Sequence, residues 1–286
     1  MYENIFLGKL SKVAIDKPHH IIYNIYVIKV EPIPNLRRKF MSICKNEFIS
    51  ELTRIFKENG MGKLLNMDKC EKLYFLTERL LEENEKYNLT AITAPAEIIL
   101  NHYCDSATLS ELLPEGAKLI DIGCGAGFPT LPLAVLREDL KITALDSTAK
   151  RVNYVKESAQ LLGLGSVNAV CMRAEVGCTL PEYREKFDFA TARAVAEMRI
   201  LAELTLPYVK IGGKLIAMKG KNAEYELSSA ARAIAMLGGK HKTTRNVTLI
   251  GEKGEIYNHP LVIVDKVNKT PAAYPRAYAQ ISKKPL

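Results

Sequence analysis

The stretch Leu119–Ala134, LIDIGCGAGFPTLPLA, decides how the rest of this chain is interpreted. An apolar run leads into three glycines, Gly123, Gly125 and Gly127, and the residues after them have helical character. Glycine tolerates positive φ angles and close backbone approach, so the pattern predicts a strand, a tight turn and a helix. Turns of this kind bind several different cofactors at the carboxyl end of a parallel strand.

The spacing of the glycines discriminates between these cofactors. A phosphate-binding loop of the Walker type needs GxxxxGK[ST], which the sequence does not contain. A dinucleotide-binding GxGxxG turn needs a glycine where the chain has Phe128 or Thr130, depending on the register. The observed GxGxG pattern is the usual form of the turn that binds S-adenosylmethionine (SAM), whose methionine and ribose parts lie close to the backbone. We therefore expect SAM as the cofactor.

Two acidic residues after later strands suit the same cofactor. Asp146 ends a predicted strand, where a carboxylate can accept hydrogen bonds from both ribose hydroxyls. Glu175 follows the next strand beside Ala174 and can accept a hydrogen bond from the adenine amino group. The alternative roles are a helix cap for Asp146 and an ordinary surface charge for Glu175. Asp121, inside the first strand, is expected to brace the glycine turn.

Short apolar strands alternate with helical stretches from Lys118 onward. Five candidate strands separated by helices imply a mostly parallel sheet with both faces covered. Two more, separated only by a loop, imply a hairpin and therefore one antiparallel edge strand. We predict an α/β fold with a doubly wound, seven-stranded, mostly parallel sheet. The candidate strands are 118–123, 141–146, 167–172, 187–192, 213–219, 243–250 and 261–267.

The chain is expected to divide into three parts. Residues 1–40 contain three prolines and no clear helical period, so we expect an extension of unknown role, with Met41 as the natural start. Residues 41–113 are predicted to form a helical cap, and residues 114–286 a SAM-binding domain with a basic C-terminal tail. Helices in the cap are predicted from Met41 to Gly60, from Asp68 with a capping-box-like DKCE start, and from Pro95 to about Leu113.

Charge and composition limit the classes of partner. The net charge is +8, and residues 1–40 carry seven Lys/Arg against three Asp/Glu while residues 265–286 carry five against one. Basic ends on a neutral body suit a polyanion, although a pair of solvated tails would give the same pattern. Six cysteines without a CxxC pair, and no histidine at zinc-ligand spacing, predict no metal site and a reducing, cytoplasmic setting. No apolar run near the N-terminus is long enough to span a bilayer, so no membrane partner is expected.

A closer resemblance rests on motifs spread in order over residues 41–286. They are YNLTAIT (87–93), His102 followed by Asp105-Ser106, DIGCGAGFPTLPLA, DSTAKR (146–151), RAE (173–175), FDFATARAVA (187–196), KG (219–220) and YPR…KKPL. Together they resemble the bacterial small-subunit ribosomal RNA guanine-N7 methyltransferases, a family once called glucose-inhibited division protein B. The chain departs from the family pattern at Asn101, where Arg is frequent, and at Ala279 and Ile281, where Gly and Pro are frequent.

This resemblance implies a class I SAM-dependent methyltransferase fold with a small N-terminal helical cap. It implies methyl transfer to N7 of a guanine in the 530-loop region of 16S ribosomal RNA, with that RNA or the small ribosomal subunit as the partner. It also implies SAM contacts at Gly123 and Phe128 of the glycine turn, at Ala174 and Glu175, and at Arg193 of the string ARA.

Chemistry at guanine N7 needs few reactive side chains. Methylation at pyrimidine C5 generally uses a cysteine after a proline, and the chain has no Pro-Cys pair. Methylation of an exocyclic amine typically uses an Asn/Asp-Pro-Pro-aromatic string, where this chain reads TARAVA. Guanine N7 has an exposed lone pair and no proton, so it needs alignment and exclusion of water but no general base. No catalytic residue is assigned, and His102 is expected to be an internally satisfied helix histidine.

RNA contacts are expected from basic residues near the site and in the tail. Lys219 is assigned to an RNA phosphate or to a structural turn. Arg193 is assigned to the cofactor loop or to guanine O6, because a donor on N7 would block the attack. The tail offers Arg276, Lys283 and Lys284, with Tyr274 or Tyr278 for stacking, unless the segment YPRAY packs against the domain and leaves only the lysines free.

Other functions stay open at this point. The main alternative is a SAM enzyme that acts on a small molecule or a protein. An oxidoreductase is disfavoured because GxGxxG fails in both registers, and a non-catalytic RNA-binding module is disfavoured by the intact set of glycines and acids. We expect a monomer.

Overall fold

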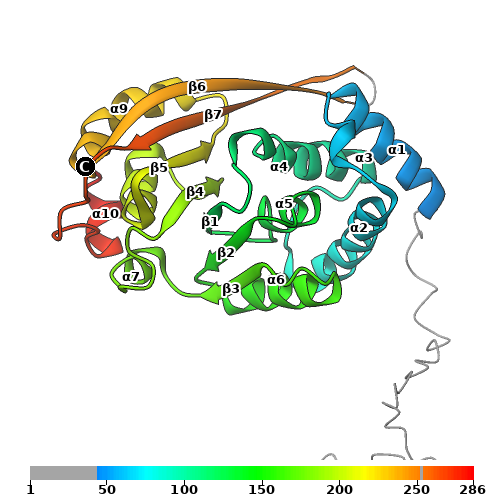
Figure 1. Ribbon diagram of the computed structural model, residues 1–286, viewed down its shortest axis with the longest axis horizontal. Helices are drawn as coiled ribbons and strands as arrows, with labels where there is room; N and C mark the ends of the chain where they lie inside the picture. The colour runs from blue at the N-terminus through cyan, green and yellow to red at the C-terminus, as the bar shows by residue number, and fades with distance from the viewer. Residues whose placement is uncertain (1–43, 252–253) are drawn as a thin grey trace, which may run out of the picture. The chain divides into compact units, whose positions relative to one another are not determined.

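The computed structural model describes residues 44–251 and 254–286 (Figure 1), so the predicted extension 1–40 lies outside the described residues. The first part is helical. It comprises α1 (Lys45–Glu58), the 3-10 turn η1 (Gly62–Leu64), α2 (Met67–Tyr87), α3 (Pro95–Ile98), the π-helical segment η2 (Ile99–Cys104), α4 (Asp105–Ala107) and the 3-10 turn η3 (Ser110–Leu112).

The starts of these helices agree only in part with the sequence prediction. Asn66 caps α2, because its side chain accepts a hydrogen bond from the backbone N–H of Lys69 at 2.9 Å. The predicted DKCE capping box is therefore wrong, since Asp68 already lies in the first helical turn, where its charge suits the helix dipole. Pro95 begins α3, as predicted from its fixed φ.

The helix predicted from Pro95 to about Leu113 is not continuous. It widens into the π-helical segment η2 between α3 and α4, and the sequence pattern gave no sign of that change. A π turn accommodates an extra residue and is frequent at functional sites. Here the segment contains Asn101 and His102, and Asp105 follows it at the start of α4.

A seven-stranded sheet follows, in the order β3-β2-β1-β4-β5-β7-β6. The first five strands are parallel. This order is that of a class I SAM-dependent methyltransferase and confirms the predicted doubly wound α/β fold. The strands are β1 (Lys118–Ile122), β2 (Lys141–Asp146), β3 (Val167–Cys171), β4 (Phe187–Arg193), β5 (Val209–Met218), β6 (Gly239–Ile250) and β7 (Ile256–Lys266).

The predicted hairpin is present, but the expectation of an antiparallel edge strand is wrong. β7 is antiparallel to both β5 and β6 and lies between them, so β6 forms the edge of the sheet. The reason lies in composition. The residues Leu261–Val264 of β7 are apolar and buried, whereas β6 carries the exposed run Lys240–Thr243. The apolar strand takes the position with two neighbours, and the polar strand takes the edge.

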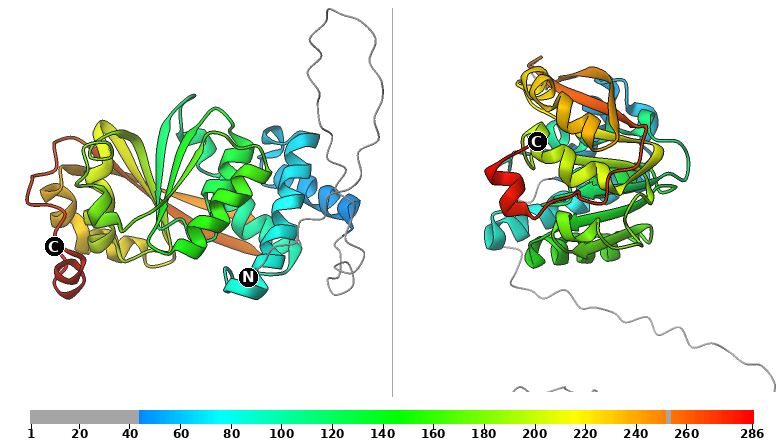
Figure 2. Two further views of the ribbon diagram at one scale, coloured as in Figure 1. Left: turned by 90° about the horizontal axis from the view of Figure 1, so that it is seen from below. Right: turned by 90° about the vertical axis from the view of Figure 1, so that its left-hand side faces the viewer.

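Helices cover both faces of the sheet (Figures 1 and 2). Alternate strand residues point to opposite faces, so Leu119 of β1 enters one apolar core and Ile120 enters another. One core lies under α5 (Thr130–Leu136), α6 (Ala149–Leu161) and the cap helices. The other lies under α8 (Met198–Thr205) and α9 (Ala223–Met236), with α7 (Ala174–Gly177), η4 (Leu206–Tyr208) and α10 (Tyr278–Lys283) beside them.

Polar anchors hold the C-terminal tail against the second layer of helices. The Arg276 guanidinium donates to both carboxylate oxygens of Glu203, at 2.9 and 2.6 Å, and the Glu203 side chain is fully buried. The Arg184 guanidinium donates to the backbone oxygen of Tyr274 at 3.0 Å. Lys283 and Lys284 are exposed, in or directly after α10, which lies at the end of the sheet opposite α1 (Figure 1). The tail therefore packs against the domain and leaves these two lysines exposed.

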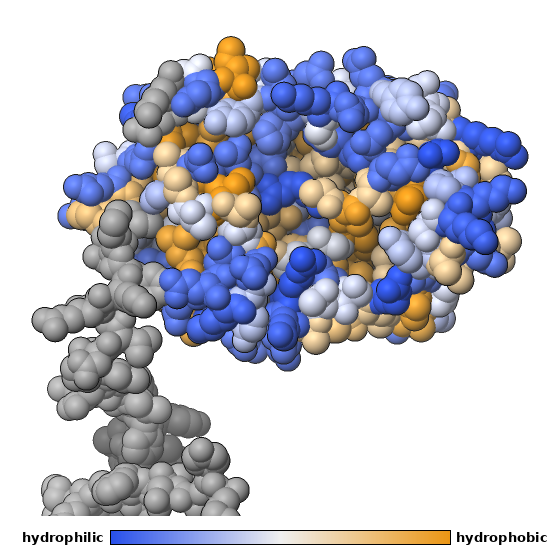
Figure 3. Space-filling model, turned by 180° about the vertical axis from the view of Figure 1, so that it is seen from behind, coloured by the Kyte–Doolittle hydropathy of each residue, from blue (hydrophilic) through white to orange (hydrophobic). Residues whose placement is uncertain are grey.

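The outer surface is mixed in character. Hydrophilic residues cover much of the face drawn in Figure 3, and smaller hydrophobic areas interrupt them. None of the helices within residues 44–251 and 254–286 is long and apolar enough to cross a bilayer. The same residues contain no cluster of three His, Cys, Asp or Glu side chains that could hold a metal ion.

Replacing Arg276 with Ala is expected to lower the free energy of unfolding by about 3 kcal/mol, because the buried Glu203 carboxylate loses its partner. Urea denaturation measures this change. Lys283→Ala, an exposed position on the same tail, is the matched control and is expected to leave the free energy of unfolding within about 0.5 kcal/mol of wild type. An unchanged midpoint for Arg276→Ala would show that the pair does not hold the tail.

Candidate active site

Each glycine of the turn between β1 and α5 has a backbone reason to be glycine. Gly123, Gly125 and Gly127 have φ angles of +73°, +55° and +82°. A Cβ on Gly123 would lie 2.6 Å from Cγ2 of Val195, and one on Gly127 would lie 2.5 Å from Cδ1 of Leu131. A Cβ on Gly125 would meet nothing closer than 3.8 Å. All three positions therefore favour glycine for their positive φ angles, and Gly125 also borders open space. At Gly123 and Gly127 close packing excludes a side chain as well.

Asp146 ties the glycine turn to the end of β2. Its carboxylate accepts hydrogen bonds from the backbone N–H of Gly125 at 3.0 Å and from that of Thr148 at 2.8 Å. Thr148 is the N-cap of α6, so Asp146 supports the start of this helix without being its cap residue. The Arg151 guanidinium approaches the same carboxylate at 3.8 Å. The side chain is thus fixed at the carboxyl end of β2, where a ribose would be held.

Asp121 supports the end of the turn where α5 begins. The Thr130 hydroxyl donates to Oδ2 of Asp121 at 2.6 Å, and the side chain is fully buried. Its Oδ1 makes no hydrogen bond within the described part of the chain. Burial raises the pKa of this carboxyl to about 6. These contacts agree with a bracing role and place Asp121 below the cavity surface.

A cavity of about 320 Å³, here called the glycine-side cavity, opens at the carboxyl ends of β1, β2 and β3. Its lining includes Gly123, Asp146, Ala174 and Glu175, so the structure brings four of the predicted cofactor residues together. The Glu175 carboxylate accepts a hydrogen bond from Nε of Arg173 at 2.5 Å. Tyr278 of the tail also lines this cavity, which the sequence did not predict.

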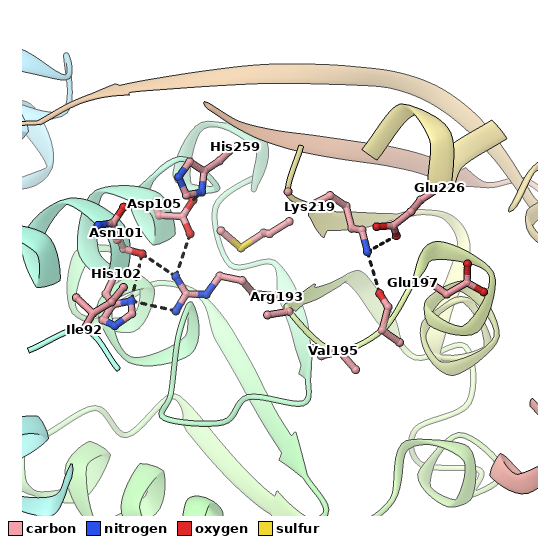
Figure 4. Close-up of a pocket in the computed structure, with 14 residues that line it drawn as sticks. Ile92, Asn101, His102, Asp105, Arg193, Val195, Glu197, Lys219, Glu226 and His259 are labelled. Atoms are coloured by element: carbon pink, nitrogen blue, oxygen red, sulfur yellow. Dashed lines mark hydrogen bonds and ion pairs between the residues drawn. The ribbon is translucent and has the colours of Figure 1, made fainter. Parts of the chain in front are cut away.

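A second cavity of about 740 Å³, here called the Arg193 cavity, adjoins the first (Figure 4). The two cavities share Ala194 and Val195, which follow β4. The polar lining of the second cavity comes from the π-helical segment and α4, from the ends of β4 and β5, and from α9 and β7. These residues are Asn101, His102, Asp105, Arg193, Glu197, Lys219, Glu226 and His259.

Arg193 is held in place by three groups from the η2–α4 region. Its Nη1 donates to the backbone oxygen of Asn101 at 2.8 Å and to Oδ2 of Asp105 at 3.0 Å. Its Nη2 lies 3.2 Å from Nδ1 of His102. The guanidinium also lies over the Phe128 ring, 5.4 Å from its centroid, and that ring stacks on His102 at 4.1 Å. Arg193 lines the Arg193 cavity and Phe128 packs beside it, and neither lines the glycine-side cavity, so their contact with SAM stays a prediction.

The tautomer of His102 follows from its neighbours. A guanidinium can only donate, so Nδ1 of His102 accepts from Arg193. The 3.1 Å approach of Nδ1 to the Asn101 oxygen is then a contact between two acceptors. The ring proton lies on Nε2, which donates to the Thr90 hydroxyl at 3.1 Å. Burial, with a smaller effect of the nearby Arg193 charge, lowers the pKa of His102 to about 4. His102 is thus a neutral, internally bonded histidine, as expected.

The predicted RNA-binding residues fall into two groups. The Lys219 ammonium donates to the backbone oxygen of Ala196 at 2.8 Å and pairs with Glu226 at 2.6 Å, which favours the structural-turn role. The Arg276 guanidinium is paired with Glu203, which favours the alternative that the segment YPRAY packs against the domain, and its contact with RNA stays a prediction. Lys283 and Lys284 are the exposed members of the set.

His259 is the residue of this region that the sequence analysis missed. It lies on β7, more than 60 positions after the last strand residue of β4, and no spacing rule connects the two. Its Nδ1 lies 3.3 Å from Oδ1 of Asp105, and its side chain is about 29% exposed in the Arg193 cavity. A single histidine before a proline carries no recognisable pattern, so only the fold could bring it to Asp105.

A long side chain at Gly125 is expected to abolish SAM binding. Gly125→Arg should raise the SAM dissociation constant at least about a hundredfold, because a bulky group would compete for the space next to Asp146. Gly125→Ala is the control, since its Cβ meets no close atom and the positive φ costs only about 1–2 kcal/mol. Calorimetric titration with SAM measures both, with circular dichroism to confirm folding. Unchanged SAM affinity in a folded Gly125→Arg variant would place the cofactor elsewhere.

The depressed pKa of His102 predicts a pH-dependent contribution to stability. Because the folded-state pKa is about 4 and the ordinary value is 6.5, the unfolded chain binds the proton first, and stability is lost as pH falls through this window. His102→Gln has no such loss. As pH falls from 7 to 4, the free energy of unfolding of His102→Gln is expected to rise by roughly 3 kcal/mol relative to that of wild type. Urea denaturation at each pH measures this difference. A stability difference that stays constant across these pH values would contradict the assignment.

Comparison with known proteins identifies the family. Residues 69–253 match the family model described as rRNA small subunit methyltransferase G. A protein named Ribosomal RNA small subunit methyltransferase G from Clostridium perfringens is 44% identical over 230 residues, which cover 80% of this chain and 95% of that protein. A protein of the same name from Lactobacillus delbrueckii subsp. bulgaricus is 47% identical over 219 residues, covering 75% and 90%. A solved SAM-dependent methyltransferase from Methanosarcina mazei is 18% identical, with a TM-score of 0.45 over 57% of this chain and 98% of that chain. On its family match and these relatives, the chain belongs to the rRNA small subunit methyltransferase G family.

Proposed function

We propose that this protein transfers the methyl group of SAM to N7 of a guanine in 16S ribosomal RNA, in the 530-loop region that the family resemblance implies. Ribosomal RNA, free or in the small subunit, is the proposed partner. The relatives' name, Ribosomal RNA small subunit methyltransferase G, supports the substrate class. No observation favours the alternative of a small-molecule or protein substrate.

The observation that carries this proposal is the pair of adjoining cavities. The glycine-side cavity offers what SAM needs, namely backbone without a side chain at Gly123 and the acceptors Asp146 and Glu175. The Arg193 cavity is large enough for a nucleotide base and meets the first cavity at Ala194 and Val195. A base in one cavity and a sulfonium methyl in the other would therefore meet beside Ala194 and Val195.

The reaction places few demands on the protein beyond alignment. When bound, SAM supplies an electrophilic methyl group; the guanine N7 lone pair forms the new N–C bond as the S–C bond breaks, and the positive charge passes to the base. The protein's part is to hold both reactants in line and exclude water. The lining of the Arg193 cavity contains three carboxylates, Asp105, Glu197 and Glu226, against the cations Arg193 and Lys219. This balance suits a base that becomes positively charged.

The predicted domain organisation belongs to the same proposal. Residues 41–113 act as a helical cap on the methyltransferase domain 114–286, and the enzyme works as a cytoplasmic monomer without a metal. The exposed Lys283 and Lys284 supply contacts to RNA phosphates. Residues 1–40 are an extension that activity does not need.

Labelled methyl transfer tests the proposed function. The full chain is incubated with methyl-labelled SAM and small ribosomal subunits from cells that lack the enzyme, and the label is mapped by cleavage selective for N7-methylguanine. One labelled guanine in 16S RNA is the expected result. SAM binding without RNA labelling would redirect the proposal to a small-molecule or protein substrate. The same assay on a chain that starts at Met41 tests the extension, and lost labelling there would contradict its dispensability.

A further inference from the structure

One buried carboxylate joins two groups that line the Arg193 cavity (Figure 4). The Asp105 side chain is only 2% exposed. Its Oδ2 accepts from Nη1 of Arg193 at 3.0 Å, and its Oδ1 lies 3.3 Å from Nδ1 of His259. The three residues come from α4, β4 and β7, so the tertiary fold alone creates this arrangement.

The tautomer of His259 can be inferred from Asp105, whose Oδ1 lacks a hydrogen-bond donor. Oδ1 makes no well-aligned hydrogen bond in the described part of the chain, and a buried carboxylate oxygen without a donor is costly. The Nδ1 of His259, which lies within reach, can supply that donor with a small rotation of a partly exposed ring. A neutral imidazole that donates from Nδ1 has an acceptor lone pair on Nε2. The Asp105 carboxylate therefore favours the His259 tautomer in which Nε2 is a hydrogen-bond acceptor.

Arg193 supplies the complementary donor. Asn101, Asp105 and His102 use its two terminal nitrogens, whereas Nε has no hydrogen-bond partner among the described residues. This nitrogen is also not fully buried. The cavity thus offers an N–H donor from Arg193 and an acceptor from His259, both fixed by Asp105.

A donor and an acceptor in one cavity can match one edge of guanine and oppose the same edge of adenine. Guanine presents the O6 acceptor beside the N1–H donor, whereas adenine presents an N6 amino donor beside an N1 acceptor. Enzymes that act on a base extruded from its stack read this Watson–Crick edge. Contacts at O6 and N1 leave N7 uncovered, which methyl transfer to N7 requires.

Resting on the proposed function, we propose that Asp105 orients His259 so that its Nε2 accepts the N1–H of the target guanine while Arg193 donates to O6. Asp105 is the positioning residue, because it acts through the other two. His259 and Arg193 contact the base. Together they select guanine over adenine.

The proposal is tested first by kinetics on small subunits from cells lacking the enzyme. His259→Phe keeps the ring but removes the acceptor, so kcat/KM is expected to fall about tenfold or more. His259→Gln retains an acceptor oxygen and is expected to stay within about threefold of wild type. S-adenosylhomocysteine affinity should not change in either variant. Asn258→Ala, whose side chain bonds Thr248 on β6, is the matched control and should keep wild-type kinetics.

Nucleotide inhibitors then show which edge of the guanine base the enzyme contacts. GMP, IMP and 1-methyl-GMP are compared as competitive inhibitors of methylation. Wild type is expected to bind GMP and IMP similarly and 1-methyl-GMP about tenfold more weakly, because methylation removes the N1–H. His259→Phe should lose this difference. Equal inhibition of wild type by GMP and 1-methyl-GMP, no inhibition by GMP, or an unaltered ratio in His259→Phe would each overturn the proposal. Absence of RNA labelling by wild type would instead refute the proposed function.

Discussion

The contact between Gly123 and Val195 is the constraint around which both cavities are built. Val195 reaches so close to the glycine turn that a Cβ at Gly123 would lie 2.6 Å from one of its methyl groups. The end of β1 and the loop after β4 can approach each other only because that side chain is missing. As a result, Val195 lines both the glycine-side cavity and the Arg193 cavity. Any larger residue at position 123 would push the glycine turn and Val195 apart.

Buried ion pairs fix the elements that surround these two cavities. Arg193 binds Asp105 across the boundary between the cap and the sheet, and Arg276 binds Glu203 across the boundary between the tail and α8. Such pairs add little stability compared with apolar packing, but removal of one partner is costly, so they specify where each element docks. The first pair also orients groups that line a cavity, whereas the second only anchors the tail. Two similar ion pairs therefore serve different purposes because of what surrounds them.

The sequence was sufficient for the local features of the fold. Three glycines after an apolar run predicted the turn, and the alternation of strands and helices predicted the seven-stranded, doubly wound sheet, because both depend on short-range periodicity. The sequence was insufficient where the outcome depends on contacts that its local pattern does not show. The position of β7 inside the sheet depends on which strand of the hairpin is more apolar, and the N-cap at Asn66 depends on a side-chain rotamer. The π-helical segment at Ile99–Cys104 left no periodic trace.

The candidate site divides in the same way. Gly123, Asp146, Ala174 and Glu175 could be chosen from the sequence because they lie at or shortly after the ends of three strands, and parallel strands end at the same edge of a sheet. The place of Arg193 with Asp105, the ion pair that occupies Arg276, and the approach of His259 could not, because their partners lie on elements distant in the chain. The sequence by itself determined the turn, the sheet and four residues that line the glycine-side cavity, through local pattern. Only the tertiary structure decided which charges neutralise each other and which face the second cavity, since a side chain's partners are set by packing rather than by spacing.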